Sequence, residues 1–91
     1  MRRTKVRLLL KTLAEHMRER RKSLGLSQEQ LADRAGLSPN YVAKLELEKR
    51  APSLSVLNAL ADALEVTVSE LLSEGAQVGP MEVTEEIARV V

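Results

Sequence analysis

One side of a short predicted helix carries the residues best suited to contact a partner molecule. The spacing of Val42 and Leu45 turns these two side chains toward the interior. The opposite side faces solvent or a partner, and it carries Pro39, Asn40, Ala43 and Lys44. A helix of this size fits the major groove of DNA, where side chains contact the edges of the bases.

Two short helices, each with its own start signal, position this face. Ser27 can cap the first helix, and Gln30 three residues later completes a capping box. Gly36 supplies the left-handed residue that ends this helix, and Ser38 followed by Pro39 starts the second. Two helices joined by about three residues through a glycine predict a helix-turn-helix.

Apolar residues at helical spacing predict three more helices around this pair. The preceding helix runs from Leu9 or Leu10 to Leu24, and its apolar stripe is Leu10, Leu13, Ala14, Met17 and Leu24. A fourth helix, capped by Ser53, buries Leu54, Leu57, Leu60, Ala61 and Leu64, and a fifth, capped by Thr67, carries Leu71 and Leu72. We therefore expect a compact all-α domain over residues 9–73, a basic arm at 1–8, and a linker and tail at 74–91.

The composition excludes several classes of protein. The 91 residues include one aromatic residue, Tyr41, and no cysteine, so an aliphatic helical core and a reducing compartment are expected. No apolar run is long enough for a secretion signal or a membrane span, which predicts a cytoplasmic location. His16, the only histidine, is expected on an exposed helix face. Because the sequence has no catalytic, metal-ligand or cofactor motif, an enzyme is not predicted.

Charge is divided unevenly along the chain. The net charge is +1, but residues 1–50 carry 13 Lys and Arg against 6 Asp and Glu, whereas residues 51–91 carry 1 against 7. This division indicates a basic half that faces a polyanion and an acidic half held away from it. A solvated basic helix face is the alternative, and charge alone does not decide between them. The basic arm likewise either follows a phosphate backbone or is a frayed terminus without a role.

These segments together resemble the Cro/C1-type helix-turn-helix proteins, an XRE-like family of phage repressors, restriction-modification controllers and small bacterial regulators. The resemblance covers residues 21–72. It is carried by LGLSQEQLADRAGLS, KLE at 44–46, KRAPS at 49–53 and ALADALEVTVSELL at 59–72. It implies a lambda-repressor-like fold and a bacterial or phage-type DNA-binding protein that needs no cofactor and is nucleoid-associated when bound.

The same resemblance implies roles for individual residues. The helix at about Ser38–Leu47 would enter the major groove, where the Asn40 amide can pair with adenine and Lys44 can reach guanine. Pro39 would contact a thymine methyl, and Ala43 lies on the same base-facing side. The residues expected at DNA phosphates, which position the domain without determining sequence preference, are Gln28, Ser38, Tyr41, Lys49, Arg50 and Ser53.

The resemblance also bears on two acidic residues near the end of the third helix. Arg21 lies on an apolar stripe, where a charge needs a partner, and Glu46 matches the family's acidic partner for it. We therefore expect a partly buried Arg21–Glu46 ion pair. The family usually has glycine where this chain has Glu48. Either the helix continues past this position, or Glu48 takes a conformation that glycine adopts more easily. An acid there would also weaken phosphate contacts by Lys49 and Arg50.

Two functions fit these residues. The first is a sequence-specific transcriptional regulator, a repressor, that binds a two-fold-symmetric operator as a homodimer, because one helix contacts too few bases for useful specificity. The expected dimer surface comprises Leu71, Leu72, Met81, Val83 and Ile87. The alternative is a protein-interaction module, such as the antitoxin of a toxin–antitoxin pair, with or without DNA binding, whose acidic tail contacts a partner protein.

Overall fold

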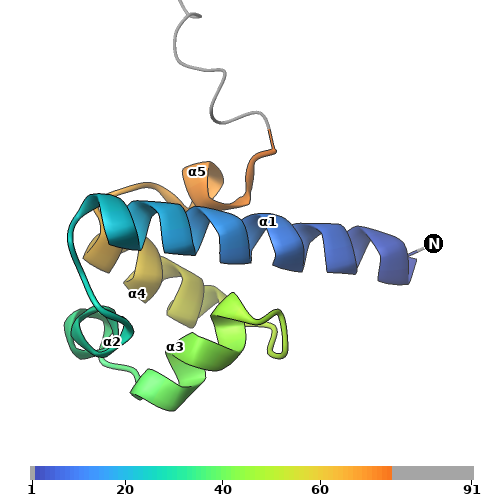
Figure 1. Ribbon diagram of the computed structural model, residues 1–91. Helices are drawn as coiled ribbons and strands as arrows, with labels where there is room; N and C mark the ends of the chain where they lie inside the picture. The colour runs from blue at the N-terminus through green and yellow to red at the C-terminus, as the bar shows by residue number, and fades with distance from the viewer. Residues whose placement is uncertain (1, 75–91) are drawn as a thin grey trace, which may run out of the picture.

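The computed structural model describes the backbone of residues 2–74 and the side chains of residues 5–74. This part of the chain forms five helices and no strand: α1 (Arg2–Ser23), α2 (Gln28–Ala35), α3 (Pro39–Glu46), α4 (Leu54–Leu64) and α5 (Val68–Leu72). In Figure 1, α1 crosses the molecule, with α5 above it and α2 and α3 below. The predicted all-α fold is confirmed.

An all-aliphatic core holds the five helices together. Each helix contributes at least one leucine, and the largest fully buried side chains are Leu13, Met17, Leu31, Val42, Leu45, Leu60, Leu64 and Leu71. Tyr41 packs at the edge of this core and is half-buried. Burying one such apolar side chain stabilises the folded state by about 1.5–3 kcal/mol. Packing, rather than intrinsic propensity, therefore stabilises helices as short as α2 and α3.

Each helix after α1 begins at the cap residue that the sequence predicts. Ser27 Oγ accepts a hydrogen bond from the Gln30 amide at 3.0 Å, and Gln30 Oε1 accepts one from the Ser27 amide at 2.8 Å. Thr67 and Glu70 form the same reciprocal pair at the start of α5. The other two caps are Ser38 and Ser53. Local sequence therefore sets where these four helices begin.

Four helices end at a left-handed residue, but only two of them have glycine there. Gly25 and Gly36 follow α1 and α2 with φ of +73° and +71°, and Glu48 and Glu65 follow α3 and α4 with φ of +64° and +62°. In each case the next amide donates back into the last turn at 2.9 to 3.0 Å. Of the two conformations open to Glu48, the structure has the left-handed one, which is strained for a residue with Cβ.

Replacing Glu65 with glycine is expected to raise the free energy of unfolding by about 0.5–1 kcal/mol, because glycine adopts a positive φ without the steric cost of a Cβ. The ion pair lost with Arg34, at 3.6 Å and largely exposed, is worth little. Thermal denaturation followed by circular dichroism measures the change. The control is Glu65→Ala, which removes the carboxylate but keeps Cβ. If both variants raised the free energy of unfolding equally, the backbone explanation would be contradicted.

The amino-terminal segment is helical, so the prediction of a loose basic arm is wrong for the residues that the structure describes. α1 begins at Arg2 rather than at Leu9 and runs to Ser23. Residues 2–8 contain no glycine or proline, and extending an existing helix needs no new nucleus. None of the described helices, α1 included, combines the length and apolar character needed to cross a bilayer.

Three side chains lie elsewhere than expected. Leu54 is 79% exposed, because it is the first residue of α4 and precedes the first buried one, Leu57, by nearly a turn. Leu71 is 1% exposed and belongs to the core, which rules it out as a dimer contact. His16 is half-buried, and its Nδ1 lies 3.0 Å from the Leu71 carbonyl oxygen. Of the remaining predicted dimer residues, Leu72 is half-buried, and Met81, Val83 and Ile87 lie outside the described residues.

Candidate nucleic-acid interface

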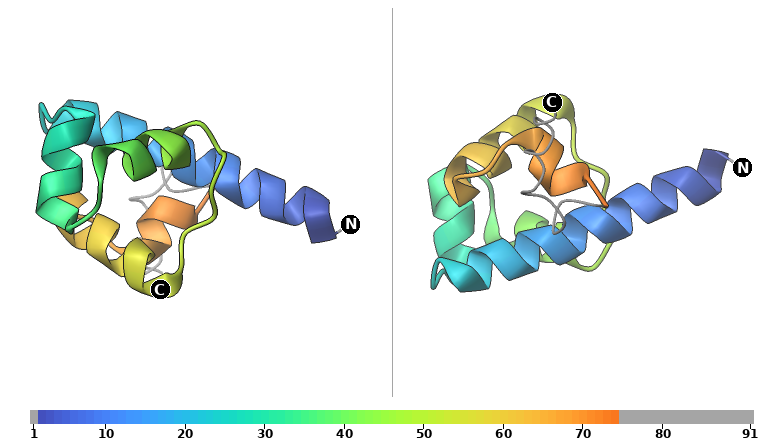
Figure 2. Two further views of the ribbon diagram at one scale, coloured as in Figure 1. Left: turned by 90° about the horizontal axis from the view of Figure 1, so that it is seen from below. Right: turned by 90° about the horizontal axis from the view of Figure 1, so that it is seen from above.

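α2 and α3 form the predicted helix-turn-helix. Residues 36–38 link the two helices. α3 packs into the core through Val42 and Leu45, which are 0% and 1% exposed. α3 nevertheless lies at the surface, as the view from below shows (Figure 2, left). One side of this helix is therefore anchored and the other is open to a partner.

The four residues expected at the bases lie along this open side of α3. Pro39 and Asn40, in the first turn, are exposed, whereas Ala43 and Lys44, one turn later, are half-buried. The most accessible part is therefore the amino-terminal turn, the end by which helix-turn-helix proteins contact base edges.

The residues expected at phosphates surround α3, and several of them have protein partners. The Ser38 and Ser53 hydroxyls accept hydrogen bonds from cap amides at 3.1 and 3.2 Å. An accepting hydroxyl retains a proton to donate. Lys49 and Arg50 are exposed in the segment after α3, and the Arg50 guanidinium lies 5.0 Å from the centroid of the Tyr41 ring. This cation–π contact holds Arg50 beside α3.

Glu46 ties α3 to α1 and α2. Its carboxylate is buried and accepts two hydrogen bonds from Arg21, at 2.8 Å from Nε and 3.1 Å from Nη2. The Gln28 amide nitrogen donates a third at 3.0 Å. Arg21 Nη1 also donates to the Leu26 carbonyl oxygen at 2.9 Å. The expected ion pair is present, and its bidentate geometry fixes the end of α3 relative to its support.

Gln28 is half-buried and has a partner that the sequence did not predict. One N–H of its amide points to Glu46, and an amide nitrogen carries a second N–H. The residue therefore belongs to the cluster that positions α3, and the second N–H is the group that remains for the expected phosphate contact.

A set of cationic side chains that cap helix carboxyl ends was missed. Arg18, Arg20 and Arg34 donate to carbonyl oxygens in the last turns of α3 and α4, at 2.6, 2.8 and 3.2 Å. The His16 ring nitrogen Nδ1 also lies 3.0 Å from the Leu71 carbonyl oxygen at the end of α5. Positive charge is favoured at this end of a helix dipole. The partners are 28 to 55 residues apart along the chain, so no local spacing could have revealed them.

A comparison with protein families agrees with this geometry. The helix-turn-helix family HTH_3 matches residues 17–71, which is more than half of the chain. The chain belongs to this helix-turn-helix family. Its members are DNA-binding transcription regulators, so the resemblance expected from the sequence is confirmed.

Relatives of this helix-turn-helix protein include named regulators. It is 44% identical to the control protein C.SmaI of Serratia marcescens over 61 residues, which cover 67% of this chain and 73% of that protein. It is 41% identical to the immunity repressor protein of Bacillus phage phi105 over 63 residues, which cover 69% of this chain and 44% of the repressor. The chain thus spans less than half the length of the phage protein.

Solved structures show the same helix-turn-helix fold. The restriction-modification controller protein C.AhdI from Aeromonas hydrophila matches with a TM-score of 0.66 and 40% identity, over 68% of this chain and 94% of that one. A chain of the complex of SinR protein with SinI protein matches with a TM-score of 0.67 and 25% identity. The match covers 86% of this chain and 77% of that chain.

Part of the positive charge in this helix-turn-helix protein is used inside the domain. Arg18, Arg20, Arg21 and Arg34 all donate to protein carbonyl or carboxylate oxygens. The excess of Lys and Arg over Asp and Glu in residues 1–50 therefore overstates the positive charge that is available to a polyanion. The cations on or directly after α3 are Lys44, Lys49 and Arg50.

Proposed function

We propose that this protein is a sequence-specific transcriptional repressor that binds a two-fold-symmetric operator as a homodimer. The observation that carries the proposal is the exposed first turn of α3, which includes Asn40 and is held in place by the buried Glu46 cluster at the other end of the helix. A helix that contacts bases has to be held in one orientation to discriminate between them. The names of the related immunity repressor and control protein support the same function.

In this proposal α3 enters the major groove by its amino-terminal end. The Asn40 amide pairs with adenine, and Lys44 donates to guanine O6 or N7. Pro39 and Ala43 offer apolar contacts to thymine methyl groups. The proposed phosphate contacts are Gln28, Ser38, Tyr41, Lys49, Arg50 and Ser53. They fix the register of the domain on the duplex.

The homodimer follows from the small number of bases that one α3 can contact. Two copies related by a two-fold axis place their helices in successive major grooves about 34 Å apart, which doubles the sequence that is recognised. Such a repressor works where DNA is found, in the cytoplasm of a bacterial host and on the nucleoid when bound.

The second candidate is a protein-interaction role, such as that of an antitoxin. The structural likeness to a complex of two proteins, SinR with SinI, favours it. The acidic residues 74–91 are the segment that the sequence offers to such a partner, and all but Glu74 lie outside the described residues. The two roles are compatible in one chain.

Selection from a pool of random DNA duplexes, followed by sequencing, tests the proposed function. We expect enrichment of an inverted repeat, with affinity for the selected duplex falling steeply as salt concentration rises, because phosphate contacts release counterions. The control is a shuffled duplex of the same composition. Failure to enrich any sequence, with only weak salt-sensitive binding, would contradict the repressor and favour the protein-interaction role.

A further inference from the structure

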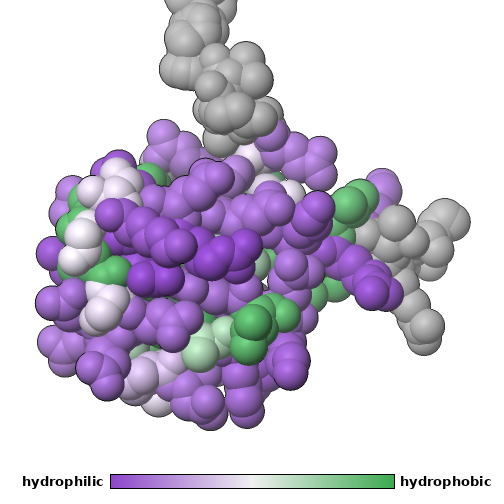
Figure 3. Space-filling view, viewed as in Figure 1, coloured by the Kyte–Doolittle hydropathy of each residue, from purple (hydrophilic) through white to green (hydrophobic). Residues whose placement is uncertain are grey.

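The apolar side of α1 continues past the end of the helical bundle. Val6, Leu9 and Leu13 recur at three- and four-residue intervals, which places them on one side of the helix. Leu13 is in the core and 2% exposed, whereas Val6 and Leu9 are 49% and 47% exposed. Figure 2 (right) shows this end of α1 projecting past the other helices, and Figure 3 shows hydrophobic side chains gathered over it. We call residues 5–9 the overhang. Among the described residues, nothing covers its apolar surface as the bundle covers Leu13.

The overhang is also basic. In residues 1–14 the charged side chains are all cations: Arg2, Arg3, Lys5, Arg7 and Lys11. α1 has no acidic residue in its first turn, so these cations lie toward the positive end of the helix dipole, where negative charge is favoured. The sign of the charge changes farther along α1, at Glu15 and Glu19. A segment that covers the overhang should therefore be apolar and acidic.

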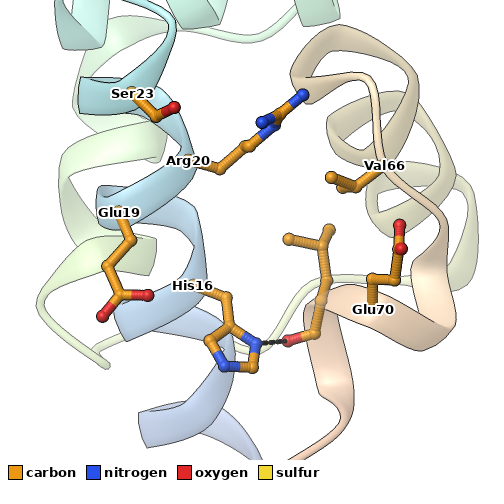
Figure 4. A pocket seen from close by; sticks show the side chains of 7 residues that line it. His16, Glu19, Arg20, Ser23, Val66 and Glu70 are labelled. Carbon is orange, nitrogen blue, oxygen red and sulfur yellow. Dashed lines mark hydrogen bonds between the residues drawn. The ribbon is translucent and has the colours of Figure 1, made fainter. Parts of the chain in front are cut away.

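The chain leaves α5 beside the same end of α1. His16 Nδ1 lies 3.0 Å from the carbonyl oxygen of Leu71, which places the last turn of α5 against α1 (Figure 4). Glu74, the last residue that the structure describes, lines a hollow of about 410 Å³ that Leu8 and Thr12 of α1 also line. Because Leu8 belongs to the overhang, the chain that follows Glu74 starts at the edge of the overhang.

We propose that residues 81–91 pack against the overhang of the same copy. This segment, MEVTEEIARVV, has both of the properties that the overhang calls for. Its apolar side chains are those of Met81, Val83, Ile87, Val90 and Val91. Its acidic side chains are those of Glu82, Glu85 and Glu86, against a single cation, Arg89. The apolar residues extend the core over Val6 and Leu9, and the glutamates face the cations of the overhang.

The connecting residues 75–80 are long enough for this contact. Six extended residues reach about 20 Å, whereas Lys5 is only three residues from Leu8, about 4.5 Å along the axis of α1. A segment tethered this closely has an effective concentration on the order of millimolar, which favours the overhang of its own copy over that of a second copy. In the other direction along α1, Glu15 and Glu19 would repel the glutamates of residues 81–91.

A spin label tests which part of α1 the segment contacts. The chain has no cysteine, so Ala88→Cys introduces the only thiol for a nitroxide. We expect the label to broaden the amide NMR signals of residues 5–9 strongly and those of residues 15–19 much less. Both ranges lie three to seven residues from Thr12, beside Glu74, so a segment without a docking site would broaden both alike. Equal broadening of the two ranges, or none in residues 5–9, would overturn the proposal.

A mixed sample identifies whose overhang is contacted. Isotope-labelled copies without a nitroxide are mixed with nitroxide-labelled copies that give no NMR signal. We expect the signals of residues 5–9 to stay sharp in this mixture, because the contact lies within one copy. Broadening as strong as in the singly labelled protein would place the segment on a second copy and overturn the proposal.

Substitutions in the full chain test the apolar part of the contact. Val83→Ser with Ile87→Ser should remove the broadening and speed hydrogen exchange of the amides of residues 6–9 by about tenfold, because the first turns of α1 lose their packing. Ala76→Ser with Val78→Ser, in the connecting residues, is the matched control. Exchange that is equally fast in the wild type and in the variant at 83 and 87 would overturn the proposal.

Charge reversal tests the electrostatic part. Lys5→Glu with Arg7→Glu should weaken the broadening of residues 5–9, and raising the salt concentration should weaken it in the wild type, because both changes reduce the attraction to the glutamates. Lys22→Glu, an exposed cation at the other end of α1, is the control, and circular dichroism verifies folding. Broadening that the double reversal leaves unchanged would overturn the role of the charges.

These experiments are independent of the proposed DNA binding, because the spectra are recorded without DNA. An operator enriched by a protein whose residues 5–9 stay sharp would keep the repressor and remove this contact. A clear contact in a protein that enriches no DNA sequence would do the opposite. A segment packed on its own overhang would also have to leave it before contacting a partner protein, which connects the contact to the second candidate function.

Discussion

Replacing Glu46 with alanine is expected to lower the free energy of unfolding by about 3–5 kcal/mol, because it leaves a buried arginine without its counter-charge. The Arg21 side chain is 12% exposed and would lose two hydrogen bonds, and Gln28 would lose its acceptor. In a domain of this size each kcal/mol corresponds to about 4–8 °C in Tm. Chemical denaturation measures the free energy, and a calorimetric scan measures Tm.

Two controls separate charge from packing at Glu46. The double variant Arg21→Met with Glu46→Leu removes both charges. It should lower the free energy of unfolding by less than Glu46→Ala alone does, because no unpaired buried charge remains. Glu48→Ala, two residues away and exposed, should change stability by less than about 0.5 kcal/mol. A loss below about 0.5 kcal/mol for Glu46→Ala would refute the ion pair as the anchor of α3.

Replacing Asn40 with alanine is expected to weaken binding to the selected operator by about 10- to 100-fold, the equivalent of one bidentate base contact worth about 1–3 kcal/mol. The preference at one base pair of each half-site should relax, while the dependence on salt stays the same. Asn40 is exposed and outside the core, so the fold should be unaffected. Repeating the selection with the variant measures both the affinity and the base preference.

Lys49→Ala is the matched comparison for Asn40→Ala. Lys49 is exposed just after α3, and a phosphate contact there should weaken binding to all sequences alike. The slope of log affinity against log salt should fall by about 0.9 for each contact removed. If Asn40→Ala changed the salt slope and left every base preference intact, Asn40 would be a phosphate contact and not the base contact proposed here.

Much of the helix-turn-helix could be predicted because its signals are local. Ser27, Ser38, Ser53 and Thr67 cap helices through amides only three residues ahead, and Gly36 ends α2 by its own backbone freedom. The Arg21–Glu46 pair could be predicted for a different reason. A charge on an apolar stripe needs a partner, and the family resemblance indicated which residue that was.

The errors arise where a residue's environment depends on distant parts of the chain. Leu54 matches the apolar pattern of α4 but lies before its first buried residue, and the pattern carries no information on where the core ends. Leu71 was expected at the surface, but α5 packs it inward. The basic half of the chain was expected either to face a polyanion or to be a solvated helix face, whereas Arg18 and Arg20 cap helices that fold against α1.

The sequence by itself determined that there are five helices, where four of them begin and which face of α3 is open, because caps and apolar periodicity act over a few residues. Only the tertiary structure decided which cations remain for DNA, how far α1 continues past the bundle, and that Glu19 and Glu70 line a pocket between α1 and α5. These features depend on which helix lies against which, and that follows from burying the aliphatic side chains of all five helices in one core.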